Sequence, residues 1–177
     1  AINNLLTFSN GLLNTDTNYI IINDNATVSG ATTLKYINGS CRKVGDDMFV
    51  FPIGNRGKYA PIAISNPNNT TDHFTATYYY KNPDSLYSVS LLESGLHNIS
   101  TVEYWLLDRT NGTSNVNVSL YWDNTSRVSN LPDLRVARWN DTMWVNQGNL
   151  ESFGDTTSGN ISSDLISDFS PFTFASI

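Results

Sequence analysis

The sequence predicts an all-β protein, and three observations support this prediction. Apolar and polar residues alternate with a period of two in short runs, as at 74–80 and 116–122. Most of these runs end at turn-forming residues such as Asn38-Gly39 or Asn82-Pro83. No stretch carries the apolar stripe of an amphipathic helix over several turns. We therefore expect an antiparallel β-sandwich, immunoglobulin-like or jelly-roll-like, of roughly ten short strands.

The predicted strands follow one another along the whole chain. They cover residues 19–22, 34–37, 48–51, 59–64, 74–80, 102–107, 116–122, 134–139, 143–145 and 172–177. The segment 86–96 is the least strand-like, and 152–168 resembles a loose connection because it is rich in Gly, Ser, Thr and Asp. The length favours a single domain over residues 1–177, with a soft internal boundary near residue 45. The Asn- and Gly-rich turns before that boundary could build a small N-terminal β layer.

The alternation also assigns the faces of two strands. In 116–122 and in 74–80 the even-numbered residues are apolar or aromatic, so we expect them in the core. Burial of each such side chain stabilises the fold by about 1.5–3 kcal/mol. The odd-numbered Tyr79 and Tyr121 then become candidates for exposed aromatic residues. Trp105 and Trp122 lie in phase with aliphatic residues and are also expected in the core.

The composition points to an extracellular protein. Charged residues make up 15% of the chain, below the roughly 25% of typical soluble domains, and Asn, Ser and Thr supply much of the polarity. The net charge of -6 without a basic stripe argues against a nucleic-acid partner. No apolar run is long enough to predict a membrane-spanning segment. The chain begins at Ala1 without Met or a signal sequence, so we expect a removed leader or a piece of a longer protein.

The residue types that carry catalysis are sparse. His73 and His97 are the only histidines, and neither lies in a known nucleophile or metal-ligand motif. Cys41 is the only cysteine, so no disulfide can form within the chain, and its expected role is that of a small buried residue. No phosphate-binding loop is present, and nothing in the sequence pairs two carboxylates for glycoside hydrolysis. We therefore predict a non-catalytic protein without a cofactor.

Two binding roles stay open. Structural calcium could bind Asp and Asn side chains in the turns 23–25, 46–47 and 123–124, although no known calcium-binding loop is present. A carbohydrate could stack on exposed aromatic rings, and the candidates for such a platform are Tyr79, Tyr121, Trp139 and Trp144. For Trp139 and Trp144, packing in the core or cover of a sheet edge is the favoured interpretation.

Seven short motifs follow one another along the chain. They are YING at 36–39, FVFPIG at 49–54, YAPI at 59–62, EYW at 103–105, LRVARW at 134–139, WVNQG at 144–148 and FSPFT at 169–173. In this order they resemble a recurring module of large secreted surface proteins and adhesins of Bacteroidetes. In those proteins the module often precedes a C-terminal type IX secretion sorting domain, which this chain lacks. The resemblance implies export and display at the cell surface, and it transfers no catalytic residue. It also implies O-glycosylation at Asp-Ser/Thr-apolar sites, here Ser85, Thr142 and Thr156.

These observations lead to one main hypothesis and one alternative. The main hypothesis is a structural or adhesive surface module, either a stalk unit or a subunit that assembles end to end with other copies or neighbouring modules. Exposed strand edges can pair with another chain, and 5–8 or 172–177 could complete a neighbour's sheet. The alternative is a carbohydrate-binding module with glycans as partners.

Overall fold

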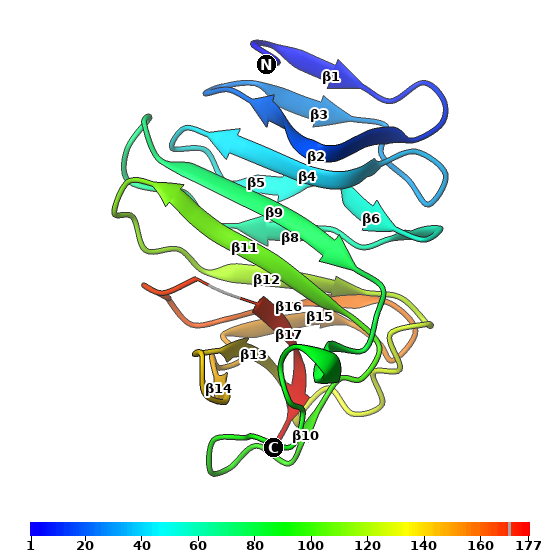
Figure 1. Ribbon diagram of the computed structural model, residues 1–177, viewed down its shortest axis with the longest axis vertical. Helices are drawn as coiled ribbons and strands as arrows, with labels where there is room; N and C mark the ends of the chain where they lie inside the picture. Colours follow the sequence, from blue (N-terminus) through cyan, green and yellow to red (C-terminus); the bar gives the residue numbers. More distant parts are fainter. Residues whose placement is uncertain (170) are drawn as a thin grey trace.

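The computed structural model describes residues 1–169 and 171–177, which fold mainly into two β-sheets packed face to face. Figure 1 shows the N-terminus and the C-terminus at opposite ends of the long axis. The all-β sandwich predicted from the alternation is confirmed. Ser170, which belongs to the motif at 169–173, lies outside the described residues.

The larger sheet contains ten strands. They are β2 (Leu13–Ile22), β4 (Ile37–Val44), β6 (Ile53–Asn55), β7 (Lys58–Tyr59), β9 (His73–Tyr79), β10 (Asn98–Ile99), β11 (Tyr104–Asn111), β13 (Leu134–Trp139), β14 (Trp144–Asn146) and β17 (Pro171–Ser176). The main path runs β14-β13-β17-β11-β9-β4-β6-β7, with β2 beside β4 and β10 beside β17.

The smaller sheet has five strands in the order β15-β16-β12-β8-β5. They are β5 (Phe49–Phe51), β8 (Ile62–Ile64), β12 (Val118–Trp122), β15 (Glu151–Gly154) and β16 (Gly159–Ser162). A separate pair is formed by β1 (Leu5–Thr7) and β3 (Thr27–Ser29). The one helix of the described residues is a short 3-10 turn, η1 (Pro83–Ser85), so no helix in this part of the chain could cross a membrane.

The N-terminal third winds as a parallel coil before the sandwich becomes antiparallel. β1 pairs with β3 in parallel, β2 pairs with β4 in parallel, and β4 pairs with β6 in parallel. From β4 onward to β9, β11, β17 and β13 every pairing in the larger sheet is antiparallel. The prediction of a wholly antiparallel sandwich is therefore wrong for this N-terminal layer. The layer is also continuous with the larger sheet, because β4 pairs with β2 on one edge and with β9 on the other.

The turn predicted at Asn38-Gly39 lies inside β4. Gly39 has a φ of +130°, and a side chain there would collide with Thr15 of β2. The hydroxyl of Thr15 accepts a hydrogen bond from the Ser40 amide at 2.9 Å. The glycine therefore allows β2 to approach β4 where the register between these strands shifts, and it does not end the strand.

One continuous core fills the space between the two sheets. The even-numbered residues of 116–122 are 0–4% exposed, and Phe74, Ala76 and Tyr78 are equally enclosed, as the alternation predicts. Trp105 and Trp122 lie in the same core. Cys41 is also buried there, as expected, and burial raises the pKa of its thiol well above the ordinary value.

The strand count is higher than predicted, because the described residues contain 17 strands. The additional ones are short and mostly polar. β15 and β16, for example, form a hairpin inside the segment 152–168 that resembles a loose connection in sequence.

Candidate functional site

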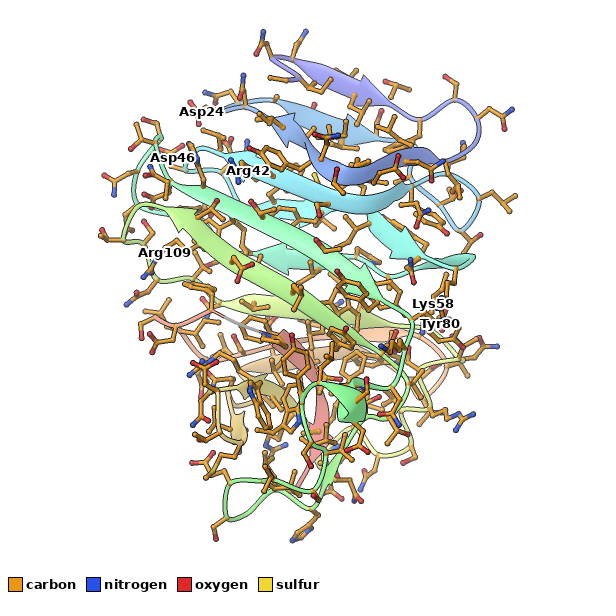
Figure 2. All side chains as sticks on the ribbon, in the orientation of Figure 1. Asp24, Arg42, Asp46, Lys58, Tyr80 and Arg109 are labelled. Carbon is orange, nitrogen blue, oxygen red and sulfur yellow. The ribbon has the colours of Figure 1, made fainter. Side chains whose placement is uncertain are left out.

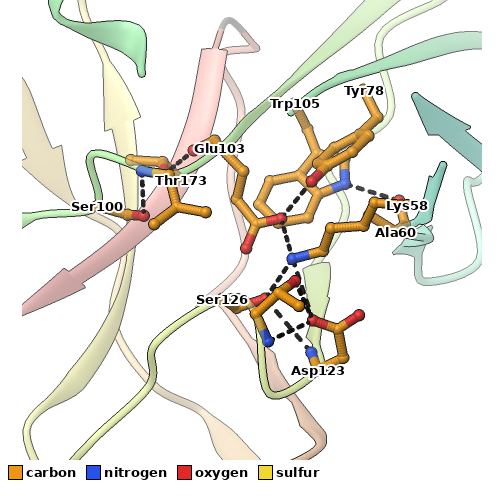
Figure 3. A network of polar contacts seen from close by, with 11 residues as sticks. Lys58, Ala60, Tyr78, Ser100, Glu103, Trp105, Asp123, Ser126 and Thr173 are labelled. Atoms are coloured by element: carbon orange, nitrogen blue, oxygen red, sulfur yellow. Dashed lines mark hydrogen bonds and ion pairs between the residues drawn. The ribbon is translucent and has the colours of Figure 1, made fainter. Parts of the chain in front are cut away.

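A buried polar network crosses from one sheet to the other (Figure 3). The ammonium group of Lys58 lies 2.9 Å from Glu103 Oε2 and 3.2 Å from Asp123 Oδ1, and it donates a hydrogen bond to Ser126 Oγ at 2.8 Å. The Tyr78 hydroxyl also donates to Glu103 Oε2, at 2.5 Å. Residues far apart in the sequence therefore meet around a single lysine.

Local structure places each member of the network. The tight turn between β6 and β7 uses positive φ at Arg56 and Gly57, and it directs Lys58 inward. Tyr78 points inward by the alternation of β9, and Glu103 immediately precedes β11. Asp123 follows the last residue of β12, so it reaches the network from the opposite sheet.

The network is enclosed and strongly coupled. Lys58 is 6% exposed and Glu103 is fully buried, whereas the side chain of Asp123 is 39% exposed. Burial and the neighbouring Glu103 carboxylate raise the pKa of Tyr78 far above its usual value, so the phenol remains a hydrogen-bond donor. The second carboxylate oxygen of Glu103, Oε1, is buried and has no hydrogen-bond partner within residues 1–169 and 171–177. An unpaired buried oxygen of this kind is costly, so its retention calls for an explanation.

A second charged cluster lies at the N-terminal end of the molecule. Lys43 is buried and donates to Asp47 Oδ2 at 2.7 Å and to the carbonyl of Asn23 at 2.9 Å. The Lys43 hydrogen bond lowers the pKa of Asp47. Asp24, Asp46 and Asp47 bring ligand atoms within 4.8 Å of one another, and Figure 2 labels Asp24 and Asp46 at this end. The structure thus brings together two of the three turns considered for calcium, although the Lys43 ammonium already lies against one of the carboxylates.

The third turn considered for calcium is separate from this cluster. Asp123 belongs to the Lys58 network, and its Oδ1 accepts hydrogen bonds from the amide and the hydroxyl of Thr125. The carboxylate therefore has protein donors in place of a metal ion.

A row of aromatic rings lies on the outer side of the larger sheet. Tyr79 stacks on Tyr104 at 4.9 Å between ring centroids, and Tyr87 contacts Tyr104, Trp139 and Trp144. Burial and the adjacent tyrosines raise the pKa of Tyr104 to about 12. The segment that follows η1 covers the row, since Leu92 and Leu96 pack with both tryptophans.

This arrangement disperses the four residues predicted as a carbohydrate platform. Trp144 is fully enclosed and Trp139 is 9% exposed, so neither presents an open ring face to a sugar. The reason is the cover from the segment after η1, which sequence alternation does not reveal. Tyr79 and Tyr121 are half-buried and belong to different sheets, whose inner faces share one core, so they point outward on opposite sides.

The predicted O-glycosylation residues are accessible. Ser85, Thr142 and Thr156 are all exposed, in η1 and in two turns. Thr142 Oγ1 donates a hydrogen bond to Asn140 Oδ1 at 2.8 Å, which fixes its rotamer in that turn. Modification at these positions stays a prediction.

Among the described residues, two sheet edges at the N-terminal end lack a neighbouring strand over most of their length. The amide of Thr27 donates to the Asn4 carbonyl and the amide of Phe8 donates to the Ser29 carbonyl, so the amides and carbonyls of Leu5 and Thr7 point away from β3. The outer edge of β2 is bridged by Ile2 at Ile22. A shallow groove of about 440 Å³ separates β3 from β5 and is lined by residues including Val28, Met48 and Val50.

Comparison of the chain with models of known protein families finds no match, and comparison with curated protein sequences finds none either. The structure and the residues themselves therefore carry the functional argument.

Proposed function

We propose that this chain is a non-catalytic structural module of an extracellular surface protein, which assembles end to end through open strand edges. The observation that carries the proposal is the parallel coil of β1 to β4. Its outer edges on β1 and β2 have no neighbouring strand over most of their length in the part of the chain that the structure describes. Unpaired amides and carbonyls on an edge form a template for a further strand. A strand from a second copy of the chain would extend the coil by the pairing it already uses.

The position of the chain ends supports this role. The N-terminal coil and the C-terminal residue lie at opposite ends of the long axis (Figure 1), as a unit in a linear array requires. One part of the sequence hypothesis is wrong, however. Residues 172–177 cannot serve as a free donor strand, because β17 is paired with β13 on one edge and with β11 and β10 on the other.

The composition and the sequence resemblance support an extracellular location. The surface depends on Asn, Ser and Thr more than on charge, and the three Asp-Ser/Thr-apolar sites are exposed. The resemblance to Bacteroidetes surface modules adds export by type IX secretion to the proposal. Glycan binding is the weaker alternative, because the two tryptophans of the predicted platform are enclosed.

The assembly proposal is tested by the concentration dependence of size. We expect light scattering and electron microscopy to show linear oligomers of the wild-type chain at high concentration. Leu5 is 53% exposed on the open edge, and Leu5→Lys places a charge there that opposes strand addition. Leu5→Lys should raise the concentration needed for association by about tenfold or more, which corresponds to ~1.4 kcal/mol.

Leu165→Lys is the matched control, since Leu165 is 63% exposed and lies outside the strands. This variant should associate like the wild type. A wild-type chain that stays monomeric at every accessible concentration would refute end-to-end assembly, and so would equal effects of the two substitutions.

A further inference from the structure

The amine of Lys58 contacts both an aspartate carboxyl group and a buried glutamate. Lys58 Nζ lies 3.2 Å from Asp123 Oδ1 and 2.9 Å from Glu103 Oε2. A reaction between two side chains requires that the fold hold them next to each other, and this ion pair supplies that proximity. Lys58 begins β7 in the larger sheet and Asp123 directly follows β12 in the smaller sheet, so the two groups come from opposite sheets.

The surroundings of the lysine exclude most water. The Tyr80 ring lies 5.1 Å from Nζ, Tyr78 is bonded to Glu103, and Trp105 packs against Tyr78. Figure 2 shows Lys58 beside Tyr80 at the side of the molecule. In an enclosed site, transfer of a proton from an ammonium group to a carboxylate removes two charges that water does not stabilise.

Glu103 has the properties of a proton carrier. Its Oε2 contacts the lysine nitrogen, while its Oε1 is buried and has no hydrogen-bond partner. Tyr78 fixes the carboxyl group in place through Oε2. A fully buried carboxylate with one oxygen that accepts no hydrogen bond lowers the stability of a purely structural ion pair, but it suits a group that accepts and releases protons.

Asp123 has donors where negative charge would develop. Its Oδ1 accepts from the Thr125 amide at 2.9 Å and from the Thr125 hydroxyl at 2.6 Å. Attack on the carboxyl carbon would concentrate charge on this oxygen, and positioned donors stabilise such an oxyanion. Burial raises the pKa of Asp123, but the Thr125 hydrogen bonds and the Lys58 charge outweigh it and lower the pKa, so Asp123 begins as the carboxylate.

From this geometry we infer that Lys58 and Asp123 join through an intramolecular isopeptide bond, with Glu103 as the catalytic proton carrier. Glu103 accepts a proton from Lys58 Nζ and passes it to Asp123 Oδ2, which makes the carboxyl group neutral. The lone pair freed on Nζ then attacks Asp123 Cγ, the C–N bond forms, and the electrons of the C=O bond move to Oδ1. Glu103 next transfers a second proton from Nζ to Oδ2, and the C=O bond to Oδ1 forms again. Oδ2 leaves as water when the C–O bond breaks.

The atoms and charges of this reaction balance without another reactant. The lysine ammonium supplies two of its three protons to the water, and the amide nitrogen keeps the third. Asp123 Oδ1 becomes the amide oxygen, and Glu103 ends ionised as it began. The product would covalently connect β7 of the larger sheet to the end of β12 of the smaller one.

A second buried lysine paired with an aspartate allows a comparison within the same chain. Lys43 and Asp47 form an ion pair at 2.7 Å, closer than Lys58 and Asp123, with the lysine equally buried. Asp47 and Asp123 are exposed to a similar extent, at 35% and 39%, so exposure does not separate the two pairs. In the described residues no buried glutamate contacts Lys43, whereas Glu103 contacts Lys58. This pair should therefore remain ionic.

Intact mass under denaturing conditions tests the inference directly. The wild-type chain and Lys43→Arg should each be about 18 Da lighter than their sequences require, the mass of one water. Lys58→Arg and Glu103→Gln should show the full sequence mass, and circular dichroism should show that both variants fold. Proteolysis of the wild type should yield a branched peptide that joins Lys58 to Asp123.

The wild-type measurement decides the matter even if a variant fails to fold. A wild-type mass equal to the sequence mass would overturn the inference and leave an ion pair only. A loss of water that maps elsewhere, such as a cyclised Asp, would overturn it as well.

Discussion

Two buried tryptophans offer a direct test of how the core is held. Trp105 and Trp122 both lie in the core, both pack edge-on against Phe174, and each indole donates to a backbone carbonyl at 2.9 Å. The two acceptors differ. Trp105 bonds the carbonyl of Ala60, a residue 1% exposed, whereas Trp122 bonds the carbonyl of Asp155 in an exposed turn.

At both positions Trp→Phe removes the indole N–H donor and a similar volume of ring. The losses of packing energy therefore largely cancel when the two variants are compared. At Trp105 the Ala60 carbonyl is left buried without this donor, which costs about 1–3 kcal/mol more. At Trp122 water can replace the indole at Asp155. We therefore expect Trp105→Phe to lower the free energy of unfolding by about 1–3 kcal/mol more than Trp122→Phe does.

The assay is equilibrium unfolding in urea, followed by circular dichroism because the substitutions alter fluorescence. Both variants should retain the wild-type m value, the slope of the free energy of unfolding against urea concentration, so that a shift in midpoint reports a change in stability alone. Equal losses, or a larger loss for Trp122→Phe, would refute the reasoning that exposure of the acceptor sets the cost.

Three further predictions follow from other sites. The Lys43 hydrogen bond lowers the pKa of Asp47 below 3.8, so this interaction stabilises the fold above that pH and is lost as the pH falls through the lowered pKa. The free energy of unfolding, measured as the pH is lowered, should therefore fall less for Asp47→Asn than for the wild type. Cys41 should react with a thiol reagent only on unfolding, since the thiol is buried and burial raises its pKa; rapid labelling of the native chain would contradict this. Gly39→Ala should destabilise by more than about 1 kcal/mol, because its φ is positive and Thr15 fills the space, and in urea unfolding it should cost more than Gly57→Ala, which has positive φ but open surroundings.

The sequence predicted the features that depend on local alternation. The inward faces of β9 and β12 and the burial of Trp105 follow from a period of two, which each strand carries by itself. The parallel coil was not predictable in this way, because an alternating strand has the same pattern in a parallel or an antiparallel pair. Short polar strands such as β15 and β16 also lack an apolar signal.

The candidate sites depended still more on tertiary structure. Lys58, Glu103 and Asp123 are distant in sequence, and none lies in a motif that distinguishes it from other charged residues. Burial of Trp144 agrees with the favoured interpretation from the sequence, but the segment after η1 that covers it was not predictable from alternation. The sequence offered one signal for the network. Lys58 directly follows the turn residues Arg56-Gly57 and directly precedes the predicted strand 59–64.

The place of β17 in the larger sheet constrains the order of folding. This strand lies between β13 and β11, although its residues are synthesised after both. Neither neighbour can complete its hydrogen bonds until residues 171–176 arrive, so the sandwich cannot close progressively from its N-terminus. A chain emerging from a ribosome or a membrane channel would leave this sandwich incomplete until residues 171–176 are free to pair.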